Sequence, residues 1–78
     1  MIEVNEEILI YAFRYTLGRQ TCAPYDIALL LIQNKDRISE YSKMIIVNDI
    51  EYFLKWNSKD HPADLVELWS NVVKELKQ

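Results

Sequence analysis

The sequence predicts an all-α fold, a compact bundle of about four helices that forms a single domain over residues 1–78. Apolar residues recur at spacings of three and four, the period of a helix that buries one face. Strict alternation of apolar and polar residues, which would indicate strands, is absent. The chain has one glycine among its 78 residues, whereas turn-dense β architectures use many.

The first helix is expected over about residues 5–17. Asn5 is a suitable N-cap, and two glutamates follow in the first turn, where the helix dipole favours negative charge. Gly18 falls where a left-handed residue ends a helix at little cost. The apolar residues at i, i+4 and i+8 are Leu9, Phe13 and Leu17.

The second helix is expected over about residues 22–33. Pro24 falls in its first turn, where the missing backbone N–H does no harm. The run from Ile27 to Ile32 is apolar all round, which in a small protein favours a central position.

The third helix is expected over about residues 37–56, with Asp36 as its N-cap. A break near residues 39–42, which would give two helices, remains an open alternative. Trp56 is expected in the core. It ends a stripe at mixed i+3 and i+4 spacing that consists of Ile38, Tyr41, Ile45, Asp49, Tyr52 and Trp56.

The last helix is expected over about residues 61–76, with Pro62 in its first turn. Its acidic residues lie early and its lysines late, in agreement with the helix dipole. Trp69 is expected in the core. The amphipathic face consists of Leu65, Val66, Trp69, Val72, Val73 and Leu76.

Charge and hydropathy narrow the class of protein. The net charge is −3 and neither half of the chain is basic, which argues against a generic nucleic-acid binder. No stretch approaches the roughly 20 apolar residues of a membrane span. The first residues are acidic, unlike the basic start of a signal peptide, so we expect a cytoplasmic location.

The residues that carry common enzyme chemistry are missing. One cysteine and one histidine exclude an internal disulfide and a His/Cys metal cluster. No phosphate-binding loop, dinucleotide-binding motif or zinc-protease motif is present. We therefore expect no catalytic residue, no metal, no cofactor and no enzyme activity. An enzyme that acts on an acidic substrate through Arg14, Arg19 and Tyr15 is the least favoured alternative.

An unusual cluster lies at the end of the first expected helix. The candidate partner-binding residues are Tyr11, Arg14, Tyr15, Gly18, Arg19 and Thr21. The first four fall on one helix face, and the last two lie in the turn beyond it. Tyrosine and arginine often anchor protein interfaces. The alternative is internal, with Arg14 or Arg19 paired to Asp26 or Asp36.

The segment from Ala12 to Thr21 resembles the A-F-R-Y-x-L-G-R-x-T motif of small uncharacterised proteins of bacteriophages, prophages and other mobile elements. With the apolar helical segment that follows, the resemblance covers about the first third of the chain. It implies a bacterial cytoplasm and a small accessory gene, and no particular activity. Many such genes encode proteins that bind a host or defence protein, so the analogy favours an inhibitor.

Two functions are therefore weighed. The leading hypothesis is an interaction protein that binds a bacterial protein, with a homodimer as an open alternative. The second is a nucleic-acid-binding regulator in which the first two helices form a helix-turn-helix. Against the second, a recognition helix needs polar side chains along its outer face, and the segment 22–33 offers few.

Overall fold

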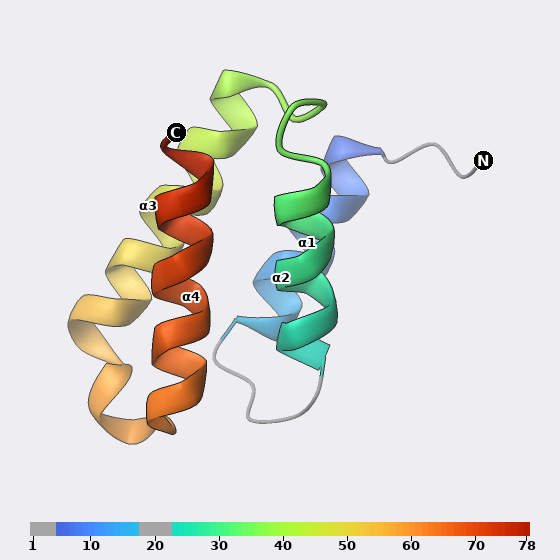
Figure 1. Cartoon of the computed structure of the whole chain (residues 1–78). Coiled ribbons are helices and arrows are strands. Elements are labelled where there is room, and N and C mark those ends of the chain that lie inside the picture. Colours follow the sequence, from blue (N-terminus) through green and yellow to red (C-terminus); the bar gives the residue numbers. More distant parts are fainter. Residues whose placement is uncertain (1–4, 18–22) are drawn as a thin grey trace.

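The computed structural model describes residues 5–17 and 23–78, and this part of the chain contains helices and no strand. The all-α prediction is thus confirmed. The elements in Figure 1 are α1 (Glu6–Thr16), α2 (Ala23–Gln33), α3 (Glu40–Trp56), the short 3-10 helix η1 (Ser58–Asp60) and α4 (Ala63–Leu76). None of these helices combines the length and the apolar character needed to cross a bilayer.

The four α-helices form two antiparallel hairpins, α1–α2 and α3–α4, that pack against each other (Figure 1). The packing places α1 beside α3 and α2 beside α4, and each of these two pairs runs parallel. Two contacts mark the register. The side chain of Glu6 reaches Ser39 at the start of α3, and the hydroxyl of Tyr25 reaches Asp64 at the start of α4.

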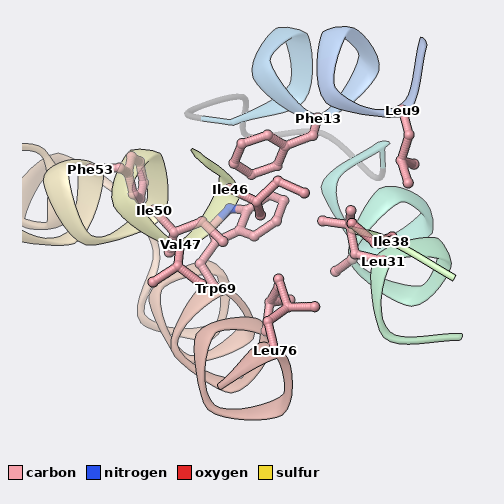
Figure 2. Packing of buried hydrophobic residues seen from close by; sticks show 12 residues of the cluster. Leu9, Phe13, Leu31, Ile38, Ile46, Val47, Ile50, Phe53, Trp69 and Leu76 are labelled. Atoms are coloured by element: carbon pink, nitrogen blue, oxygen red, sulfur yellow. The ribbon is translucent and has the colours of Figure 1, made fainter. Parts of the chain in front are cut away.

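The core lies between the hairpins (Figure 2). Phe13 of α1 and Trp69 of α4 meet edge to face with ring centroids 5.6 Å apart, and both are fully buried. This geometry suits the charge distribution of two aromatic rings. Leu31 of α2, Ile46 and Ile50 of α3 and Val72 of α4 are also fully buried there. The prediction that Trp69 lies in the core is confirmed.

The start of α1 follows its local sequence. The Asn5 side chain accepts hydrogen bonds from the backbone N–H groups of Glu7 and Ile8, so the predicted N-cap is confirmed. At the other end, Leu17 is the C-cap in an extended conformation. The predicted terminator Gly18 lies outside the described residues.

The expectation that α2 is the central helix is not met. Ala28 and Leu31 are buried, but Leu29 and Leu30 are exposed. The reason is that α2 packs chiefly against α1 and α4, so neighbours cover one side of it. Its apolar outer side faces away from the core.

The start of α3 differs from the prediction. The N-cap is Ser39, whose hydroxyl accepts the backbone N–H of Ser42, and Asp36 lies in the preceding turn. The carboxylate of Glu6 stabilises this start from outside, because it accepts the backbone N–H of Ser39 and both serine hydroxyls. From Glu40 onward α3 runs unbroken to Trp56.

Candidate functional site

Three exposed tyrosines line grooves at the junction of α1 and α3, and an exposed tryptophan lies beside one of them at the end of α3. Tyr11 is 76% exposed, Tyr41 69%, Tyr52 66% and Trp56 62%. The rings of Tyr52 and Trp56 lie 6.3 Å apart, so the row continues to the end of α3. We call these four residues and Arg14 the aromatic seam. Aromatic side chains in a folded domain usually bury most of their surface, so the row is a feature that requires explanation.

A groove of about 480 Å³ lies between α1 and the first half of α3. Ile10 and Ile45 are half-buried and form its floor, and the more exposed Tyr11 and Tyr41 form its rims. Two glutamates of the first turn of α1 lie at one end of the groove, and Arg14 lies at the other. The groove therefore has an apolar base and a charge at each end.

A second groove of about 360 Å³ lies between the end of α1 and the second half of α3. Leu17 and Phe53 supply its apolar lining, and Asp49, Asn57 and His61 supply polar groups. A histidine, a carboxylate and an amide can offer hydrogen bonds to a bound segment.

The ion pair between Arg14 and Asp49 separates the two grooves. Nε of Arg14 lies 2.7 Å from Oδ2 of Asp49, and the side chains are 56% and 32% exposed. Neither Asp26 nor Asp36 is the partner of Arg14, so the internal alternative is wrong for this arginine, and for Arg19, which lies outside the described residues, it stays a prediction. The prediction considered acids near the helix 1–2 corner, whereas Asp49 is 35 residues away in the chain. An ion pair this exposed contributes about 0.2–1 kcal/mol.

The predicted binding residues are partly brought together. Tyr11 and Arg14 line the first groove. Tyr15 is exposed one helical turn beyond Tyr11 and is not among the residues that line the two grooves of the α1–α3 junction. The remaining candidates, Gly18, Arg19 and Thr21, lie outside the described residues.

The prediction missed the contribution of α3. Trp56 was expected in the core and is exposed, because α3 turns its other side, with Ile46 and Ile50, toward the core. Within the stripe that contains Trp56, Tyr41, Tyr52 and Trp56 are exposed, whereas Ile38, which precedes the helix, is buried. One signal could have revealed this: the stripe also contains Asp49, and a carboxylate is costly to bury without a partner.

His61 is held by its surroundings. Its Nδ1 lies 2.8 Å from the carbonyl oxygen of Asn57, and its ring meets Phe53 edge to face at 4.7 Å. Because a carbonyl oxygen can only accept, Nδ1 carries a hydrogen. The half-buried ring thereby braces the turn after α3. Among the described residues, no group of three or more His, Cys, Asp or Glu is placed to hold a metal ion.

One carboxylate outside the seam has a perturbed pKa. The Tyr25 hydroxyl donates a hydrogen bond to Oδ2 of Asp64 at 2.7 Å. This bond is the main cause that lowers the pKa of Asp64 below its usual 3.8, since it stabilises the ionised form. The pair joins the first turns of α2 and α4 and is a structural contact.

Comparison with known proteins adds no assignment: no family model, no curated protein and no solved structure matches the chain. The function is therefore inferred from the aromatic seam and the two grooves beside it.

Proposed function

We propose that this chain is a small accessory protein of the phage or mobile-element type that binds a bacterial protein through its aromatic seam and inhibits a host or defence factor. The observation that carries the proposal is the row of exposed rings beside two grooves. Tyrosine, tryptophan and arginine are the residues most enriched among those that dominate binding energy. A row of them at the surface is typical of a contact surface.

The size of the row suits a protein partner. An aromatic side chain buries roughly 150–250 Å² when it is fully covered. Tyr11, Tyr41, Tyr52 and Trp56 are each more than half exposed, so together they offer roughly 400–600 Å². A stable interface buries about 800 Å² on each partner. The four rings would supply about half to three quarters of that area.

Arg14 fits the same role. Its ion pair uses Nε, and more than half of its side chain remains in contact with solvent. It therefore stays accessible to a partner at the border between the two grooves. The helix-turn-helix alternative gains no support from α2, which exposes Leu29 and Leu30 and contains no Lys or Arg.

The proposal is tested by affinity capture from nuclease-treated bacterial lysate. The test variant is Tyr41→Ala/Trp56→Ala, and the control is Leu29→Ala/Met44→Ala, which removes exposed apolar side chains outside the seam. Wild type and control should retain the same protein, and the seam variant should lose it. Each variant must keep the helical circular dichroism of wild type.

Two outcomes would overturn the proposal. If nothing is captured, a separate bacterial partner is rejected, and if the seam variant retains the protein, the seam is not the binding surface. Sedimentation tests the homodimer: a dimer that the seam variant converts to monomer would assign the seam to a second copy of this chain.

A further inference from the structure

We infer that the first groove receives a lysine or arginine side chain of the protein partner. This inference rests on the proposed function and specifies the chemistry of the partner. It follows from the apolar floor, the aromatic rims and the uneven distribution of charge along the groove.

The floor and rims suit a long cationic side chain. The floor residues Ile10 and Ile45 offer apolar surface to an aliphatic stem, as lysine and arginine require when they bury their methylene groups. The rim residues Tyr11 and Tyr41 stand on either side. The faces of such rings attract a cation, with lysine and arginine as the usual partners.

The acidic end of the groove supplies the opposite charge. Glu6 already accepts hydrogen bonds from the start of α3. Glu7 is exposed, and within the described residues no hydrogen bond or ion pair engages its carboxylate. Glu7 lies four residues before Tyr11, so the two share one face of α1. A cation above Tyr11 would therefore find a carboxylate beside it.

The basic end of the groove does not oppose this placement. Arg14 lies seven residues from Glu7, which is roughly 10 Å along a helix. Its charge is offset by Asp49 at 2.7 Å. The whole chain carries a net charge of −3, which favours approach of a basic segment. The cationic head group thus belongs at the Glu7 end.

The test uses the full chain labelled with ¹⁵N and two alanine-based helical peptides as probes. The peptides share one sequence, except that the central residue is lysine in one and methionine, which has similar length and no charge, in the other. The lysine peptide should shift the backbone amide signals of Glu7, Tyr11 and Tyr41 saturably. It should bind about fivefold more tightly than the methionine peptide at low salt.

Matched variants locate the charge. Glu7→Gln should weaken the fivefold preference for lysine, leaving only the part that the rings of Tyr11 and Tyr41 supply, and Glu67→Gln, at an exposed acid of α4, should keep the full preference. Equal binding of both peptides, equal loss of preference in both variants, or no shift at the groove with either peptide would overturn the inference. The lysate capture by the aromatic seam is independent of these peptides, so failure here is distinguishable from failure of the proposed function.

Discussion

A double-mutant cycle with Arg14→Met and Asp49→Asn would measure the coupling free energy of the ion pair between these two residues. Both substitutions remove charge and keep most of the side-chain volume. Two unit charges about 4 Å apart interact by about 1 kcal/mol in water, and the loss of side-chain freedom offsets part of this gain. Arg14 is 56% and Asp49 32% exposed, so solvent screens most of their attraction. We therefore expect a coupling free energy of about 0.5 kcal/mol.

The assay is urea unfolding at pH 7, followed by circular dichroism, in low salt and in 1 M NaCl. The coupling should fall clearly in 1 M salt, where the screening length of about 3 Å is comparable to the separation of the two charges. Arg14→Met alone should lower the melting temperature by roughly 2–4 °C. A coupling above about 2 kcal/mol, or one that persists in high salt, would refute the reasoning. Arg14 would then form a structural ion pair between α1 and α3 that is protected from solvent, and it would be a poor candidate for contact with a partner.

Three further predictions concern other parts of the fold. Trp69→Ala should destabilise the protein by about 3–5 kcal/mol, and Trp56→Ala should change stability by less than about 0.5 kcal/mol, as measured by urea unfolding. Glu6→Ala should cost about 1 kcal/mol, because the start of α3 loses an acceptor, and the same assay would show no change if this contact is absent in solution. The depressed pKa of Asp64 stabilises the fold above pH 4, and this contribution disappears as the pH falls through the folded-state pKa. Tyr25→Phe should raise that pKa toward 3.8 in an NMR titration, and an unchanged value would assign the shift to another cause.

Local sequence signals were sufficient to place the start of a helix where only one residue nearby was suited to begin it. Asn5 has no competitor as the cap of α1, and Pro24 marks the first turn of α2. Local signals were insufficient to place the start of α3, because Asp36 and Ser39 are both good N-caps and lie three residues apart. A carboxylate 33 residues away from Ser39 accepts hydrogen bonds at that position, and no local pattern contains this contact.

Sequence reasoning predicted part of the candidate site. Tyr11 and Arg14 stand on a predicted helix face with residue types that favour contact surfaces. Tyr41 and Tyr52 were assigned to an apolar stripe and not to the candidate site, because α3 carries apolar residues around much of its circumference. Periodicity locates such stripes and does not state which of them a neighbouring helix covers.

The sequence by itself determined that the chain is helical, approximately where each helix lies, and that Trp69 belongs to the core. Helix formation depends on caps and spacings within a few residues, and these are readable along the chain. Only the tertiary structure decided that α1 lies parallel to α3, that Arg14 meets Asp49, and that Trp56 is exposed. The physical reason is that a helix buries the side that its neighbours cover. That side is chosen by contacts between residues that are far apart in the chain, such as the two members of this ion pair, which are 35 positions apart.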